Sequence, residues 1–175
     1  MRRTTLAFGA LSFFLLGVAT ALAGKLTFDM NRVRGQEPAA AAAALLAEAE
    51  VQAGTGTWER IAIGDVYYRS GDRERAQKYF DAVLGATPEA SDFFRVAIVY
   101  ADGGEWDKAK PLFEKGFALK PKDHRGAADA AAWGILYKDR EWGEAQFLRA
   151  VSEAPGNTYH YVNMAGAYLG LKPRE

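Results

Sequence analysis

The sequence predicts an all-α protein in which short helix-turn-helix units repeat and stack side by side. Segments 67–88 and 100–121 match when one is laid over the other at a single constant offset. The matching pairs are Tyr67/Tyr100, Gly71/Gly104, Ala76/Ala109, Phe80/Phe113 and Pro88/Pro121. A fixed offset over so many positions is typical of a tandem repeat. Hydrophobic residues make up 49% of the chain, which favours a packed core over disorder.

Residues 1–23 are expected to be a secretory signal peptide. A basic lead, MRRTT, precedes a mostly apolar run over residues 6–23 that closes with Ala21-Leu22-Ala23, the small-x-small pattern that signal peptidase requires. The alternative is an uncleaved membrane anchor, because the run is just long enough to span a bilayer. We therefore expect an exported protein, periplasmic or extracellular. A retained anchor would hold it at the inner membrane, facing the periplasm, and only then would it contact a membrane.

Residues 24–37 are polar and without period, which predicts a flexible linker. An alanine-rich helix is expected over 38–54, because Pro38 suits the first turn of a helix and Gly54 suits its end. This helix could be a spacer or could pack on the first repeat. The need to cover Leu45, Leu46 and Val51 favours packing.

The remaining residues, 55–175, are expected to form the repeat domain. In each unit an apolar first helix ends at a glycine, and the second helix carries a small alanine, a phenylalanine one turn later and a closing proline. One such hairpin cannot bury its apolar face alone, so neighbouring units must stack. The aromatic residues expected in the core are Tyr67, Phe80, Tyr100, Phe113, Trp133, Tyr137 and Tyr168.

Pro111 falls inside the second helix of the second unit. It lies near the beginning of that helix, so we expect a cost well below the ~3 kcal/mol of a mid-helix proline, together with a small bend.

The units are expected at about 57–88, 90–121 and 124–156, with a capping helix at 157–170. In the third unit Gly134, Tyr137, Ala145 and Pro155 keep the order of the pattern but not its spacing. The last segment matches a first helix with no second helix after it. Such a helix, with a polar outer face, would cap the open end of the stack.

This pattern resembles the tetratricopeptide repeat (TPR) family. That family has an aromatic, a leucine, a small residue and a tyrosine in its first helix, then alanine, phenylalanine and proline in and after its second. The resemblance covers about two thirds of the chain and implies a short right-handed superhelix. It carries little information on function, because the matching residues are packing residues.

The sequence contains no pattern of catalytic or metal-binding residues. The absence of cysteine excludes disulfides and thiol chemistry, and a net charge of zero disfavours nucleic acid as a partner. His124 and His160 are far apart in sequence and lack partners at ligand spacing, so both are expected to be surface or cap residues. We expect neither enzymatic activity nor a cofactor or metal.

The TPR resemblance implies that the first helices line a concave groove. Seven residues are expected on its surface: Trp58, Ile61, Asp65, Tyr68, Arg69, Phe94 and Ile98. Some TPR proteins clamp a terminal carboxylate with lysine and asparagine residues, and this chain does not reproduce those positions. The positions hold Ile61, Asp65, Phe94 and Ile98 instead.

An apolar groove with a polar edge suits a peptide or protein segment, which predicts a non-catalytic scaffold of the cell envelope. The alanine-rich helix could instead occupy the groove. Two other functions stay open: a membrane-anchored assembly subunit, and a small-molecule-binding protein or weak enzyme. For the latter, only Asp65 and Arg69 offer polar groups.

Overall fold

The computed structural model describes residues 28–173, and this part of the chain is helical with no strand. Its elements are a 3-10 helix η1 (Met30–Arg32) and the α-helices α2 (Pro38–Ala53), α3 (Thr57–Arg69), α4 (Arg73–Leu84), α5 (Ala90–Asp102), α6 (Trp106–Leu119), α7 (His124–Leu136), α8 (Arg140–Glu153) and α9 (Thr158–Tyr168). The predicted all-α class is confirmed. The signal peptide and the anchor alternative fall outside the described residues.

Across residues 28–173, no helix combines the length and the apolar character that crossing a membrane requires.

The chain divides into two compact units, residues 1–45 and 46–175, and the division falls within α2. In the first unit, Asp29 caps η1 by accepting a hydrogen bond from the backbone N–H of Asn31 at 2.9 Å. In the second unit, Leu46 and Ala49 pack against the core, whereas Val51 is exposed. Residues 46–53 of α2 therefore pack on the repeat domain with one face, the face that carries Leu46 and Ala49.

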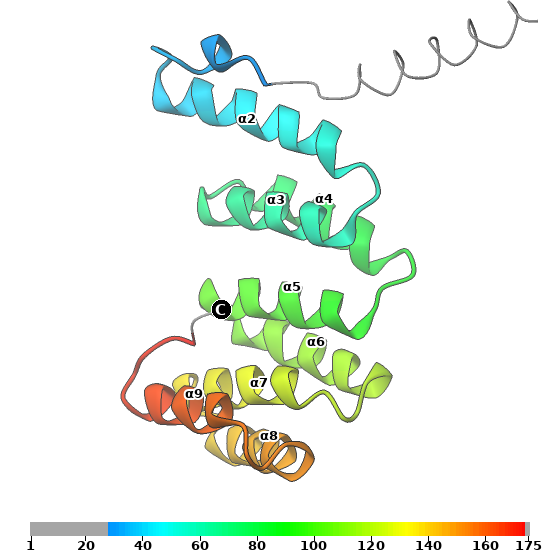
Figure 1. The fold of residues 1–175 in the computed structure, drawn as a ribbon, viewed down its shortest axis with the longest axis vertical. Helices are drawn as coiled ribbons and strands as arrows, with labels where there is room; N and C mark the ends of the chain where they lie inside the picture. Colours follow the sequence, from blue (N-terminus) through cyan, green and yellow to red (C-terminus); the bar gives the residue numbers. More distant parts are fainter. Residues whose placement is uncertain (1–27, 174–175) are drawn as a thin grey trace, which may run out of the picture. The chain divides into compact units, whose positions relative to one another are not determined.

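Three helix pairs, α3/α4, α5/α6 and α7/α8, follow one another along the second unit (Figure 1). Within each pair the two helices pack closely. The first helices also contact one another in order, α3 with α5 and α5 with α7, and α9 packs on α7. The expected stack of helical repeats is thus present, with four first helices forming one layer. The hand of the superhelix stays a prediction.

The third repeat, α7/α8, is more regular than its sequence indicated. The residue two positions before each second helix has a left-handed backbone: Gly71 (φ 95°), Gly104 (φ 90°) and Lys138 (φ 61°). The interval from Gly104 to Lys138 is only one position longer than the interval from Gly71 to Gly104. The α6 and α8 helices have the same length of 14 residues. The expected irregular spacing was therefore wrong, because a lysine stands where the other two units carry the turn glycine.

The corrected register also changes the small residue at the helix contact. Ala109 is one turn beyond the N-cap of α6, and the equivalent residue of α8 is Gly143, not Ala145. Gly134 is not a turn residue but lies within α7, facing Gly143. The N-caps of α5, α7 and α9 are also evenly spaced along the chain, at Glu89, Asp123 and Asn157.

Aromatic rings fill the layer between first and second helices. Of the seven expected core aromatics, five are buried: Tyr67, Phe80, Tyr100, Phe113 and Trp133. Tyr137 is half-buried, and its ring stacks on Trp106 with centroids 5.4 Å apart. Tyr168 is 50% exposed, contrary to expectation, because no second helix follows α9 in the described chain to cover it. Pro111 lies in α6 near its beginning, as expected.

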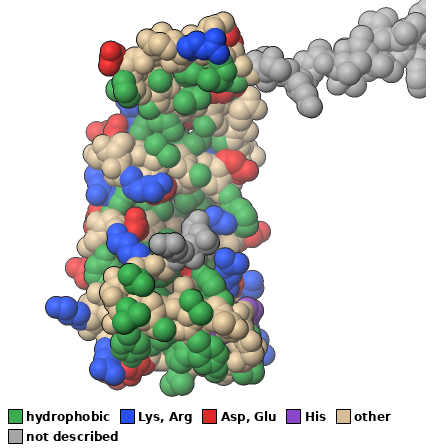
Figure 2. Space-filling view, turned by 60° about the vertical axis from the view of Figure 1, so that its left-hand side comes forward, with side chains coloured by type: hydrophobic (Ala, Val, Ile, Leu, Met, Phe, Trp, Pro, Cys, Tyr) green, Lys and Arg blue, Asp and Glu red, His purple; other side chains and the backbone are tan. Residues whose placement is uncertain are grey.

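The outer face of α9 is apolar, where a polar cap was expected. Tyr161 and Val162 are exposed on α9, Leu169 is exposed directly after it, and Leu148 is exposed on α8. Figure 2 shows many hydrophobic side chains at this end of the stack, and over the rest of the face drawn hydrophobic side chains lie among basic and acidic ones. The prediction of a polar outer face was therefore wrong.

Candidate functional site

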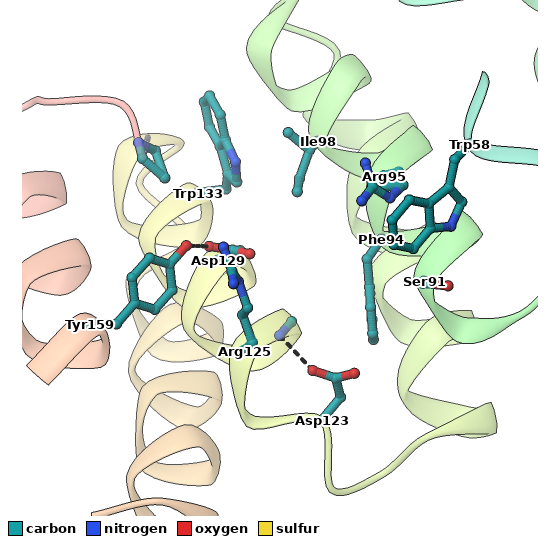
Figure 3. A pocket seen from close by; sticks show the side chains of 12 residues that line it. Trp58, Ser91, Phe94, Arg95, Ile98, Asp123, Arg125, Asp129, Trp133 and Tyr159 are labelled. Carbon is teal, nitrogen blue, oxygen red and sulfur yellow. Dashed lines mark hydrogen bonds between the residues drawn. The ribbon is translucent and has the colours of Figure 1, made fainter. Parts of the chain in front are cut away.

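Two adjoining pockets lie along the first helices of the stack, and together we call them the groove. The first has a volume of about 350 Å³ and the second about 270 Å³. The first is lined by Trp58, Ser91, Phe94, Arg95, Ile98, Asp123, Arg125, Gly126, Asp129, Trp133, Tyr159 and Pro173 (Figure 3). The second is lined by Trp58, Ile61, Ala62, Asp65, Arg69, Arg95, Ile98, Val99, Asp102, Trp133 and Pro173.

Six of the seven predicted groove residues line these pockets. Trp58 and Ile98 line both, Phe94 lines the first, and Ile61, Asp65 and Arg69 line the second. Ile61 and Phe94 are buried, so they form the floor rather than an accessible surface. Trp58, which is 54% exposed, is the most accessible apolar side chain of this set.

Tyr68 lies elsewhere. Its side chain is 3% exposed, its hydroxyl donates to Glu105 at 2.6 Å, and its ring packs edge-on against Tyr100. Ile61, Asp65 and Arg69 follow one another at four-residue spacing on one face of α3, and Tyr68 projects about 100° away from Arg69. The structure therefore brings Tyr68 to the core and not to the groove.

Arg95 is a groove residue that the sequence analysis missed. Its guanidinium lies 3.8 Å from the ring centroid of Trp58, within the range of a cation–π contact. It also covers part of the indole and places a positive charge beside Ile98. Arg95 is one turn beyond Ser91 on the same face of α5, so a helical wheel drawn from Ile98 would have found it.

The far wall of the first pocket is polar and comes from α7 and α9. The Tyr159 hydroxyl and the Asn163 side-chain amide both donate to Oδ1 of Asp129, the latter at 3.1 Å. Burial, together with the hydrogen bond and the negative charge of Asp129, raises the pKa of Tyr159 to about 12. Tyr159 therefore keeps its proton at neutral pH, and Arg125 lies 5.2 Å from its ring centroid.

Asp123 ends this wall and caps α7. Burial alone would raise its pKa, but the hydrogen bonds from the Gly126 backbone N–H (2.8 Å) and from Lys120 (3.0 Å) outweigh burial and lower the pKa. Gly126 must stay small, because a Cβ there would lie 2.7 Å from the ring of Phe94. The wall thus presents an ionised carboxylate directly beside the apolar floor.

Residues 46–53 of α2 do not line the groove. They lie against the first repeat (α3/α4) away from the groove, and Glu50 accepts a hydrogen bond from the Tyr67 hydroxyl at 3.2 Å. The alternative in which the alanine-rich helix fills the groove is therefore not realised by this part of the helix.

A different segment of the chain enters the groove. After α9 the chain reverses at Gly170 (φ 76°), where the Leu171 N–H donates to the Gly166 carbonyl at 2.9 Å. The Lys172 ammonium then donates to Asp102, to Oδ1 at 2.8 Å and to the backbone carbonyl at 3.0 Å. Pro173 lines both pockets. We call residues 171–173 the tail.

The two histidines, expected to be separate surface or cap residues, lie together instead. Nδ1 of His124 is 3.1 Å from Nε2 of His160, and His160 is fully buried. Burial, and then the charge of His124, lowers the pKa of His160. The even spacing of α7 and α9 explains the pairing, because both residues stand near the start of equivalent helices. Within residues 28–173 no three potential metal ligands cluster.

A scan against protein-family models finds no model that matches the chain, and a search of curated proteins finds no match. The TPR resemblance therefore stays a prediction that depends on the repeat positions.

Proposed function

We propose that this protein is a non-catalytic interaction module of the TPR type, and that it binds an extended peptide segment of a partner protein in the groove. The observation that carries the proposal is the pair of adjoining pockets along α3, α5 and α7. Together they offer a long apolar floor with charged side chains at its edges. Peptide-binding grooves combine these features, because apolar pockets hold side chains and polar edges orient the backbone.

The paired polar groups of the groove favour a peptide over a small molecule or a substrate. Asp65 and Arg69 form an ion pair at 2.7 Å, and Tyr159 and Asp129 share a hydrogen bond. These groups are held by one another rather than aimed at one point between them. A small-molecule site relies on polar groups that converge on the ligand.

We further propose that the module acts outside the cytoplasm, in the periplasm or beyond the cell. This proposal depends on the signal-like residues 1–23 alone. Intact mass of the exported protein tests it, because cleavage leaves a species that begins at Gly24. A mass that still includes this segment would support the anchored alternative.

The groove is tested with a library of displayed peptides selected on the wild-type protein. The strongest peptide is then measured by fluorescence polarisation against Trp58→Ala and against Leu148→Ala. Both residues are exposed and apolar, at 54% and 67%, but Leu148 lies on α8 away from the groove. We expect Trp58→Ala to weaken binding at least tenfold, as a central aromatic anchor does, and Leu148→Ala to leave it unchanged. Equal affinities for all three proteins would refute the groove as the binding site.

A further inference from the structure

We propose that the tail is an intramolecular occupant of the groove, and that the partner competing with it is an extended peptide in which a lysine is followed by a proline. The inference depends on the proposed function, because it names the peptide chemistry that the same groove would recognise. Two observations support it: the hydrogen bonds of Lys172 to Asp102, and the position of Pro173 in the lining of both pockets.

The lysine site is formed where α5 ends. Asp102 is the last residue of that helix and offers two acceptors to one ammonium group, a carboxylate oxygen and its own backbone carbonyl. The carbonyls of a final helical turn lack intrahelical partners and carry partial negative charge, which adds to the charge of the carboxylate. Lys172 Nζ also lies 5.9 Å from the ring centroid of Trp133. The site therefore selects a cation on a long side chain.

The proline site shares its pockets with aromatic side chains. Pro173 shares the lining of both pockets with Trp58 and Trp133, which Figure 3 shows on opposite sides of the first pocket. Aromatic-lined grooves favour proline because its ring is apolar and its backbone is already restricted. The Trp133 indole N–H is buried and has no hydrogen-bond partner among residues 28–173. This donor could be satisfied by a ligand carbonyl once the tail has moved.

The tail departs from the repeat at the point where a second helix would begin. The interval from Lys138 to Lys172 equals the interval between successive N-caps, so Lys172 stands where Lys138 leads into α8. In the preceding units this position is followed by a helix, whereas here the left-handed Gly170 turns the chain toward Asp102. The placement of the tail therefore follows from a specific turn and is not a continuation of the stack.

The tail is held weakly enough to exchange with a partner. The ion pair of Lys172 with Asp102 is solvent-exposed, at 57% and 41% of the two side chains, and exposed pairs contribute little. An occupant of this kind lowers the apparent affinity for a competitor by the fraction of molecules in which the groove is closed. We therefore expect release of the tail to strengthen peptide binding about two- to tenfold.

The experiment uses the full chain and a fluorescein-labelled peptide with the sequence of residues 169–175, LGLKPRE. Fluorescence polarisation compares the wild type with the release variant Lys172→Ala/Pro173→Ala and with Leu169→Ala as a control. Leu169 is exposed and does not line the groove. The release variant should bind two- to tenfold more tightly, and the control should match the wild type. Far-UV circular dichroism verifies that all variants are folded.

Charge reversal tests the lysine site directly. We call LGLKPRE the LKP peptide and its Lys→Glu counterpart LGLEPRE the LEP peptide. In the release variant, Asp102→Lys should weaken binding of the LKP peptide about two- to fivefold and strengthen binding of the LEP peptide, because the exposed pair contributes at most about 1 kcal/mol. A second measurement follows the Trp133 indole N–H by ¹H–¹⁵N correlation. Its resonance should shift in the release variant before any peptide is added, and shift again when the LKP peptide binds.

The outcomes separate this inference from the proposed function. Equal affinity of the wild type and the release variant, with an unmoved Trp133 resonance, would refute the tail as an occupant. If the LKP peptide fails to bind the release variant while a library peptide binds in a Trp58-dependent way, the lysine-proline chemistry is wrong and the groove stands. If no peptide binds in a Trp58-dependent way, the proposed function itself fails.

Discussion

Replacing Gly143 by alanine is expected to destabilise the protein, although alanine is the better helix former. Gly143 lies in the first turn of α8, where the backbones of α7 and α8 come close together. A Cβ built there would lie 2.9 Å from the carbonyl oxygen of Ala131 and 3.1 Å from the amide nitrogen of Ile135. Both are backbone atoms, which cannot rotate away, so α7 and α8 would have to move apart.

The magnitude follows from two opposing contributions. Alanine in place of a helical glycine contributes up to about 1 kcal/mol of stability. Overpacking at a tight contact costs about 1–3 kcal/mol, and contact with rigid backbone puts this site at the upper end. We expect a net loss of about 1–2 kcal/mol in the free energy of unfolding. With a urea dependence of roughly 2 kcal/mol per molar, the unfolding midpoint should fall by about 0.5–1 M.

Gly166→Ala is the matched control, because it places the same change in a helix with room. The nearest atom to a Cβ at Gly166 is the Cβ of Leu171, at an ordinary contact distance of 3.8 Å. This variant should gain about 0.5–1 kcal/mol. Urea unfolding followed by far-UV circular dichroism measures both. The reasoning is refuted if Gly143→Ala is as stable as the wild type while Gly166→Ala shows its gain.

Three further predictions concern a turn, a cap and a histidine. Lys138→Gly should raise the free energy of unfolding by roughly 0.5–1 kcal/mol in urea titrations, because glycine adopts the left-handed φ of 61° without the steric cost of a side chain. Asp92→Ala removes the acceptor of the Glu89 backbone N–H in the capping box of α5, so it should lower the thermal midpoint at a cost of about 1 kcal/mol. Burial holds the pKa of His160 below that of an unfolded histidine, so the unfolded chain takes up the proton first as the pH falls. Stability should therefore be complete above about pH 6.5 and decrease below it, and urea midpoints at pH 7.5 and 5.5 should differ less for His160→Gln than for the wild type.

The first two repeats could be predicted from the sequence because their local chemistry agrees at every level. Gly71 and Gly104 provide the left-handed turns, and Ala76 and Ala109 are fully buried where the helices approach. The third repeat obeys the same geometry with different residues. Lys138 accepts a conformation that lysine rarely adopts, so no glycine marks the turn in the sequence.

The groove was predictable only as far as one helical face. Ile61 and Asp65 were expected on the groove because the TPR resemblance implies it, and both line the second pocket. Nothing local to α3 shows that Tyr68 turns toward the second helix. Asp129 and Tyr159 depend on the correct register of the third unit. The tail depends on a chain reversal at Gly170 and on contacts between residues 70 positions apart, which no periodicity reveals.

The interval between the caps Glu89, Asp123 and Asn157 is the same on both sides of Asp123. A tandem duplication of the codons from one cap to the next would therefore keep the spacing of the caps, so the added copy would join the stack with its cap and turn in phase. Deletion of the same block would shorten the stack and would also keep the spacing of the remaining caps. Unequal recombination would thus change the length of the stack by one helix pair at a time while the spacing of the caps is kept.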